Sequence, residues 1–222
     1  MIKPAFFTPP DMPTPQQAHQ WYTAHDPVHG IDHILRVYQM AEKIALVEGA
    51  DLDIVRAAAL LHDAAGSAPD NAHNRASHHE ASASFARSVL MAEGWPEAKI
   101  LAVEHCIRAH RYRATETPQT QEAKVVFDAD KLDVLGAFGA ARTIAYAAQA
   151  NQPIFVKPSE QFLATGKKAP GEPHSSYHEY LFKLRKVKER LFTNEARRIA
   201  ETRHAYLVAF YDQLLAEAQG LG

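Results

Sequence analysis

Apolar residues recur at intervals of three and four along nearly all of this 222-residue chain, and this spacing is the feature that most restricts its fold. Residues three and four apart share one face of an α-helix, so each such segment predicts an amphipathic helix. Alternating runs of β-branched residues, which would predict strands, are missing. The sequence therefore predicts an all-α fold, a helical bundle.

The pattern divides the chain into expected helices separated by glycine, proline and polar residues. They cover about residues 15–24, 32–48, 52–64, 75–91, 96–110, 121–135, 138–149, 177–191 and 194–219. The third of these is apolar around most of its circumference, which favours a central position in the bundle. Residues 151–176 hold four of the 13 prolines, so we expect an irregular loop there.

No linker separates two hydrophobic cores, so we expect a single domain over residues 1–222. We expect its functional core to cover about residues 20–150. The irregular loop and the C-terminal helices, residues 177–219, would follow that core.

The charge balance excludes several classes of partner. Lys and Arg total 24 against 26 Asp and Glu, so no broad basic surface is available for nucleic acid or for an anionic membrane. No apolar run approaches the roughly 20 residues of a transmembrane helix, and no signal-peptide pattern is present. We therefore expect a cytoplasmic protein. The single cysteine, Cys106, excludes an intramolecular disulfide and a CxxC zinc site.

A histidine and an aspartate interrupt the most apolar segment of the chain. His62 and Asp63 directly follow the run Ala-Ala-Ala-Leu-Leu at residues 57–61, where the pattern would predict more core. Burying an imidazole and a carboxylate is costly unless each is paired or bound to a metal ion. This pair is therefore a candidate for metal binding.

Two other segments carry groups that would complete such a site. His33 and Arg36 lie three residues apart on an expected helix, so they share a face. Asp128, Asp130 and Asp133 follow one another closely, and a bound cation would relieve the repulsion between their carboxylates. A divalent ion needs several nitrogen or oxygen ligands that converge from different elements, as these segments would allow.

These segments resemble the H…HD…D signature of the HD-domain metal-dependent phosphohydrolases. The resemblance extends from about residue 20 to the C-terminus and includes His79-Glu-Ala-Ser-Ala, Ile107-Arg-Ala-His110 and the basic segment 183–188. The chain is similar in particular to small bacterial members of this family that act as nucleotide pyrophosphohydrolases. The resemblance implies four metal ligands, namely His33, His62, Asp63 and Asp130.

The resemblance also implies a reaction. One divalent ion would activate a water molecule for attack on the phosphorus of a nucleotide or another small phosphate ester. Mn²⁺ or Mg²⁺ is the first expectation for this ion, and Fe, Ni, Co or Zn are alternatives. We expect Asp63 and Lys131 to take part in the reaction itself.

Cationic side chains would hold the phosphate oxygens of such a substrate. We expect the substrate-binding groups to be Arg36, Lys131, Lys183, His110 with Arg111, and His29, with His79 close to them. His79 and His110 could instead hold a second metal ion.

The residues leave two other functions open. Some nucleotidases of the family have a glutamate three residues after the HD pair, where this chain has Gly66, so the general acid or base is undefined. One alternative is therefore a nucleotide-binding sensor without turnover. The other is a dinuclear iron oxygenase of the same superfamily, which would require His79 and His110 as ligands.

Overall fold

The computed structural model describes residues 11–22, 30–65, 72–111 and 116–221, with the backbone alone for 72–77. Within these ranges the fold contains ten α-helices, one 3₁₀ helix and no strand, which confirms the predicted all-α class. The elements are α1 Pro15–Ala18, α2 Ile31–Glu48, α3 Leu52–Leu61, α4 Ala72–Ala92, α5 Glu97–Ala109, α6 Gln121–Leu132, α7 Gly136–Gln149, α8 Glu160–Thr165, α9 Ser176–Phe182, η1 Leu184–Arg190 and α10 Asn194–Ala218.

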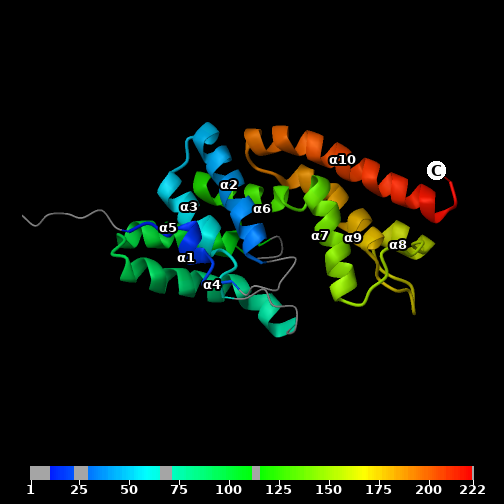
Figure 1. Cartoon of the computed structure of the whole chain (residues 1–222), viewed down its shortest axis with the longest axis horizontal. Helices are drawn as coiled ribbons and strands as arrows, with labels where there is room; N and C mark the ends of the chain where they lie inside the picture. Colours follow the sequence, from blue (N-terminus) through cyan, green and yellow to red (C-terminus); the bar gives the residue numbers. More distant parts are fainter. Residues whose placement is uncertain (1–10, 23–29, 66–71, 112–115, 222) are drawn as a thin grey trace, which may run out of the picture.

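Helix α3 lies at the centre of the first half of the fold. It packs against α2, α5, α6 and α4, and its residues 57–61 are all buried. Figure 1 shows these helices on one side of the molecule and α7, α8, α9 and α10 on the other. The apolar residues around most of the circumference of this helix therefore correctly predicted its central position in the bundle.

Helix α10 is attached to α6 by a buried carboxylate. Asp128 accepts hydrogen bonds from the backbone N–H groups of Phe192 and Thr193 and from the Thr193 hydroxyl, at 2.7–3.1 Å. Burial raises the pKa of Asp128, and these hydrogen bonds oppose that rise. Asp128 therefore fixes the start of α10.

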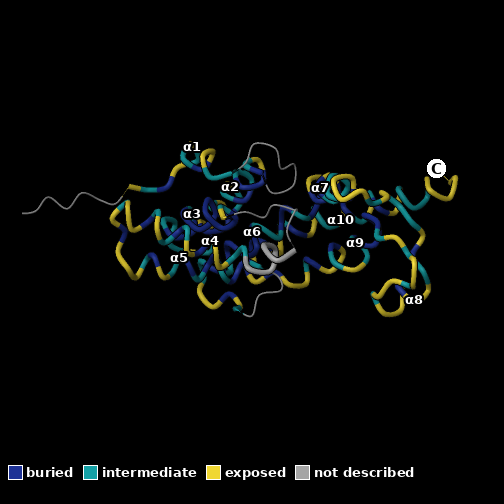
Figure 2. The backbone as a smooth tube through the Cα atoms, turned by 90° about the horizontal axis from the view of Figure 1, so that it is seen from below, coloured by how far each residue is buried: buried dark blue, intermediate teal, exposed yellow. Residues whose placement is uncertain are grey.

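The segment 151–176 departs from the expected irregular loop. It contains α8, which begins where the Ser159 hydroxyl accepts from the backbone N–H of Phe162 at 3.0 Å. The helix ends at Gly166, whose φ of 72° is in the left-handed region that glycine adopts without steric cost. Figure 2 shows α8 at the opposite end of the molecule from α1, with much of its backbone exposed.

The helix expected over residues 177–191 is divided into α9 and η1. Lys183 leaves helical geometry between them, with φ −121° and ψ −60°. Leu184 and Val187, three residues apart, are the buried residues of η1. A 3₁₀ helix aligns residues at this spacing on one face, so the short apolar pattern is satisfied without an α-helix.

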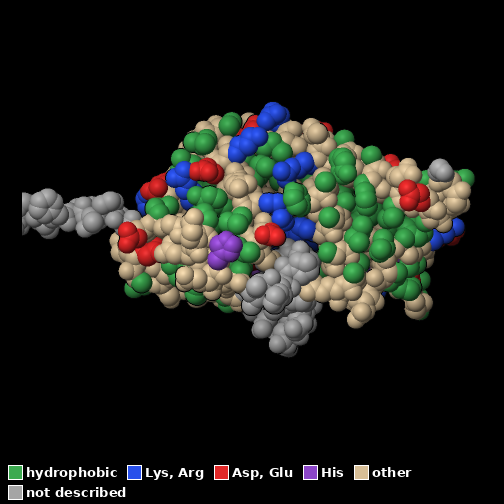
Figure 3. Space-filling view, viewed as in Figure 1, with side chains coloured by type: hydrophobic (Ala, Val, Ile, Leu, Met, Phe, Trp, Pro, Cys, Tyr) green, Lys and Arg blue, Asp and Glu red, His purple; other side chains and the backbone are tan. Residues whose placement is uncertain are grey.

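No helix within the described ranges is long and apolar enough to cross a membrane. On the face drawn in Figure 3, basic side chains form a band near the middle of the molecule with acidic side chains beside it. This mixed arrangement agrees with the balanced charge of the sequence.

Candidate metal centre

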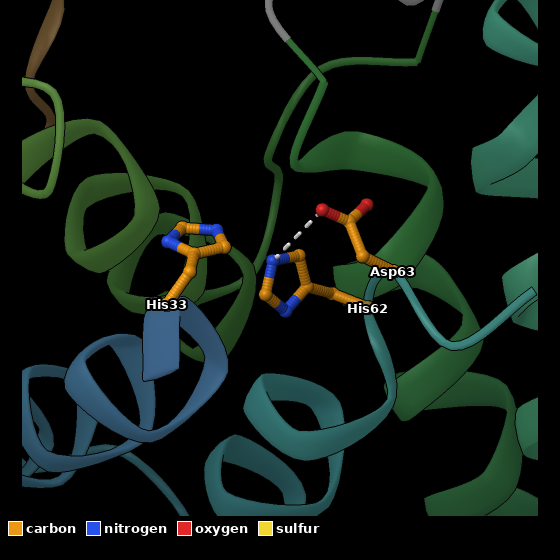
Figure 4. Close-up of side chains that lie close together, drawn as sticks. All are labelled: His33, His62 and Asp63. Carbon is orange, nitrogen blue, oxygen red and sulfur yellow. Dashed lines mark ion pairs between the residues drawn. The ribbon is translucent and has the colours of Figure 1, made fainter. Parts of the chain in front are cut away.

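Three buried side chains from two helices meet at the centre of the site. His33 comes from the first turn of α2, and His62 and Asp63 directly follow α3 (Figure 4). His62 Nε2 lies 3.5 Å from Asp63 Oδ2. One nitrogen or oxygen atom from each of the three residues lies within 4.8 Å of the others, so together they could hold a metal ion.

Helix α6 brings a second carboxylate to this group. Asp130 Oδ1 lies 3.4 Å from His33 Nε2, and the ammonium group of Lys131 donates to Asp130 Oδ2 at 2.5 Å. Although burial raises the pKa of Asp130, the charge of Lys131 and the hydrogen bond to His33 hold it well below its usual range. The structure therefore brings together all four ligands that the resemblance implies.

Hydrogen bonds fix which nitrogen of each ring faces the cluster. His62 Nδ1 lies 2.8 Å from the carbonyl oxygen of Ala59, which can only accept, so Nδ1 carries the proton. His33 Nδ1 lies 2.8 Å from Asp133 Oδ2 in the same way. Both rings thus direct Nε2 toward the cluster, and this orientation by outer partners is typical of metal-binding histidines.

Two buried atoms of the cluster have no hydrogen-bond partner in the described part of the chain. They are His62 Nε2 and Asp63 Oδ1. Burial lowers the pKa of His62 to about 4. Burial raises the pKa of Asp63, but the nearby imidazoles of His62 and His110 hold it well below its usual range. A neutral imidazole and an ionised carboxylate are the forms that bind a divalent metal ion, so the donor set fits one.

Asp133 holds His33 and two arginines together. Arg36 donates from Nε to Oδ1 at 2.8 Å and from Nη2 to Oδ2 at 3.0 Å, and Arg142 Nη1 donates to Oδ2 at 2.8 Å. The Arg36 guanidinium also lies 4.1 Å from the centre of the Phe138 ring. Arg36, expected to bind substrate, is therefore engaged with Asp133 and is not among the residues that line the pocket.

A second group of histidines lies close to the other carboxylate oxygen of Asp63. His78 Nε2, on α4, and His110 Nε2, directly after α5, lie 3.4 and 3.5 Å from Asp63 Oδ1. His110 Nδ1 lies 2.6 Å from the carbonyl oxygen of Ile107, so Nε2 is again the nitrogen directed at the carboxylate. These three residues form a second set that could hold a metal ion.

The two adjacent histidines of α4 lie in different surroundings. His79, expected near the substrate, has Nε2 at 3.8 Å from Glu80 Oε1 and does not line the pocket, whereas its neighbour His78 does. Consecutive residues of an α-helix point about 100° apart, so a change of one position selects a different face. The sequence offers two adjacent histidines, and the apolar spacing alone does not decide which of them faces the site.

A pocket of about 490 Å³ opens beside both groups of histidines. Its lining includes the cationic side chains of Lys131, Arg111, Arg142 and Lys183, and the ammonium group of Lys183 lies 3.1 Å from Glu179 Oε1. Arg142 was missed by the sequence reasoning, although it interrupts a segment of small apolar residues much as His62 does. His29 and Gly66 lie outside the described residues.

A buried hydrogen-bonded chain holds the outer wall of this pocket. His178 Nε2 lies 3.0 Å from Glu172 Oε1, and its Nδ1 lies 2.7 Å from the hydroxyl of Ser175, which lines the pocket. The hydrogen bond from His178 and those from Ser159 lower the pKa of Glu172 to about 2. The segment 151–176 is thereby tied to α9 by an ionised carboxylate.

Comparisons with known proteins agree with this geometry. The model of the HD domain family matches residues 30–135. YpgQ of Bacillus subtilis is 31% identical over 198 residues, which cover 87% of this chain and 86% of YpgQ. A crystal structure of YpgQ in complex with ADP has a TM-score of 0.69 and 28% identity, and the match covers 92% of this chain and 97% of that one.

Two further solved structures share the fold. A protein from Lactobacillus plantarum has a TM-score of 0.73 and 28% identity, over 93% of this chain and 95% of its own. An HD-superfamily hydrolase from Bacillus thuringiensis has a TM-score of 0.63 and 30% identity, over 86% and 87%. The family model spans all four of the implied ligands, and the resemblance to YpgQ extends over most of the chain. The chain belongs to the HD-domain family.

Proposed function

We propose that this protein is a metal-dependent phosphohydrolase that acts on a nucleotide or another small phosphate ester. The observation that carries the proposal is the pair of buried, unpartnered atoms, His62 Nε2 and Asp63 Oδ1, because Asp63 lines a pocket that cationic side chains also line. Unpartnered polar atoms in a protein interior are costly, and a bound cation would satisfy both.

The residues that would hold the metal ion are His33, His62, Asp63 and Asp130. A divalent ion bound there would lower the pKa of a water molecule and neutralise charge that develops on the phosphoryl group. Histidine nitrogens and carboxylate oxygens suit Mn²⁺ well, and Mg²⁺ is the other expected ion. Asp133 positions His33 through its Nδ1 proton, so Nε2 is the nitrogen directed toward the cluster.

The cations of the pocket would bind the phosphate oxygens. Lys131 lies beside Asp130, and Arg111 and Lys183 line the same pocket. Charge-assisted hydrogen bonds from such groups bind phosphate strongly. The volume of about 490 Å³ is within the range of pockets that bind small molecules. The ADP complex of YpgQ supports a nucleotide as the substrate class.

A panel of nucleoside mono-, di- and triphosphates and simple phosphate esters tests the proposal. With Mn²⁺ or Mg²⁺ present, the purified protein is expected to release phosphate or pyrophosphate from at least one nucleotide. Excess EDTA should remove this turnover, and added Mn²⁺ should restore it. Tight nucleotide binding without any product would instead favour a sensor, and turnover insensitive to EDTA would contradict the metal-dependent mechanism.

A second metal ion is the alternative that one observation favours. The two oxygens of Asp63 face different histidine groups, Oδ2 toward His62 and Oδ1 toward His78 and His110. Asp63 would belong to both groups, so a second divalent ion held by His78, His110 and Asp63 would add its charge to the stabilisation of a phosphoryl group. Two irons per chain with consumption of O₂ would favour the dinuclear oxygenase over a hydrolase.

The adjacent histidines of α4 provide a matched test of this second group. A His78→Ala variant is expected to lower the affinity of the protein for Mn²⁺, or its metal-dependent turnover, by at least about 10-fold, because a ligand or its positioning partner is lost. His79→Ala should stay within about twofold of wild type. Titration calorimetry with Mn²⁺ measures both variants, and a larger effect from His79→Ala would contradict the geometry.

A further inference from the structure

A second pocket, of about 590 Å³, lies in the C-terminal half of the chain, away from the histidine groups. Helix α8, helix α9 and η1 form most of its wall, and α10 contributes His204. No residue lines both pockets within the described ranges. The second pocket is therefore a separate cavity that the proposed phosphohydrolase site does not use.

The segment from α9 through η1 is the partition between the two pockets. Leu184 and Val187 line the metal pocket from one face of η1, whereas Arg185 and Lys186 line the second pocket from another. The two faces have opposite character. The face toward the second pocket carries positive charge, and the face toward the metal pocket is apolar at these positions.

The apolar part of the second pocket is aromatic and partly exposed. Phe162 is buried, and its ring centre lies 6.5 Å from that of Phe182, which is 45% exposed. Leu163, next to Phe162, is 64% exposed. A Cβ at Gly166 would lie 2.7 Å from the Phe182 ring, so the glycine permits this close approach. Exposed apolar side chains grouped in a cavity favour a ligand with an apolar or aromatic part.

The charged part of the second pocket carries an excess of cations. Arg185 and Lys186 are exposed, and neither forms an ion pair with a carboxylate in the described part of the chain. Glu189 is the carboxylate among the lining residues. His204 Nδ1 is buried without a hydrogen-bond partner in the same ranges. The pocket thus has two cationic side chains, one carboxylate and, in those ranges, one ring nitrogen without a partner. This balance favours a ligand that carries an anionic group.

We propose that this second pocket binds a small aromatic anion. Its ring would lie against Phe162, Phe182 and Leu163, because aromatic side chains bind other rings by edge or offset contacts. Its sulfonate, carboxylate or phosphate group would accept hydrogen bonds from Arg185 and Lys186, which are stronger when both partners are charged. The proposal depends on the geometry of this pocket alone and not on the proposed hydrolysis.

Fluorescence titration with 1-anilinonaphthalene-8-sulfonate tests the proposal, since this probe is an aromatic anion. We expect one saturable site per chain in wild type and at least a 10-fold loss of affinity in Arg185→Ala/Lys186→Ala. The matched control is Lys167→Ala/Lys168→Ala, which removes the same charge from two exposed lysines beside the pocket that do not line it. This control should bind as wild type does.

A third variant, Ala164→Phe, fills the pocket from its exposed rim without a change in charge and is expected to block the probe. Circular dichroism confirms that each variant is folded before titration. Three results would overturn the proposal: no saturable binding to folded wild type, an equal loss of affinity in both double variants, or displacement of the probe by ADP with Mn²⁺ while Arg185→Ala/Lys186→Ala binds normally. The last result would place the probe in the metal pocket.

Discussion

An Asp63→Asn variant is expected to lose at least about 100-fold of the metal-dependent turnover, because partners that merely orient a metal ligand already contribute 10–100-fold. The carboxylate of Asp63 faces His62 through one oxygen and His78 and His110 through the other. An asparagine has nearly the same shape, but it removes the negative charge. Its NH₂ group would also direct protons at ring nitrogens that should bind the metal.

The matched control is Asp53→Asn, at the other end of the same helix. Asp53 has a side chain that is 49% exposed and pairs with Lys99 on the surface. Surface pairs of this kind contribute little to stability, so this variant should keep the activity of wild type. Steady-state kinetics with the best substrate of the panel measure both variants. An Asp63→Asn enzyme that retained more than a tenth of the wild-type kcat would contradict the assignment.

An Asp133→Ala variant is expected to destabilise the fold by about 3–5 kcal/mol, the usual effect of breaking a buried ion pair by removing one partner. Asp133 is 4% exposed and accepts from His33, Arg36 and Arg142, of which Arg142 is 9% exposed. Removing the carboxylate leaves a buried guanidinium and an imidazole without their acceptor. Urea denaturation followed by circular dichroism measures the change in the free energy of unfolding.

Asp212→Ala is the control for this experiment, because Asp212 is exposed on α10 and forms no ion pair in the described part of the chain. Its free energy of unfolding should change by less than about 0.5 kcal/mol, as for ordinary surface substitutions.

The ion pairs of Asp133 also make the stability of the fold depend on pH. Burial raises the pKa of Asp133, but His33, Arg36 and Arg142 hold it well below its usual range. Its stabilising contribution should therefore be complete above about pH 4 and decline below it. A change below about 1 kcal/mol for Asp133→Ala would contradict the structural role of Asp133.

The helical class and the central position of α3 follow from the sequence because both depend on local periodicity. The run at residues 57–61 is apolar on every face, and only a helix surrounded by others can bury it. The pairing of His33 with Asp130 could be anticipated only through the family resemblance. The two residues are 97 positions apart, and periodicity carries no information about which distant helices come together.

The rotation of a helix and competition between partners decide where the expected site residues lie. His78 and His79 are equally good ligands as residue types, and the rotation of α4 against α5 decides which one faces Asp63. Arg36 shares a face of α2 with His33 as expected, but Asp133 engages its guanidinium before any substrate arrives. Spacing gives the face of a helix, whereas the partner across the interface depends on tertiary packing.

The segment 151–176 shows a different limit. Its four prolines indicated a loop, yet Ser159 and Gly166 cap a short helix between them. Both capping residues are visible in the sequence, but a helix of six residues has too little periodicity to be recognised by its apolar pattern. Glu172 and His178 form the contact that ties this segment to α9. The sequence around these two residues did not predict that they would pair.

Metal analysis of the purified protein shows whether the histidine and aspartate cluster binds a divalent ion. Wild type and His62→Ala are stripped with chelator, incubated with Mn²⁺, desalted, and analysed for manganese per chain, with unfolding curves to confirm that both are folded. Wild type is expected to retain at least one Mn²⁺ per chain and His62→Ala well under one, because His62 Nε2 is a buried atom with no other partner in the described part of the chain. Wild-type protein that retained no metal ion, or a His62→Ala variant that retained as much as wild type, would contradict it.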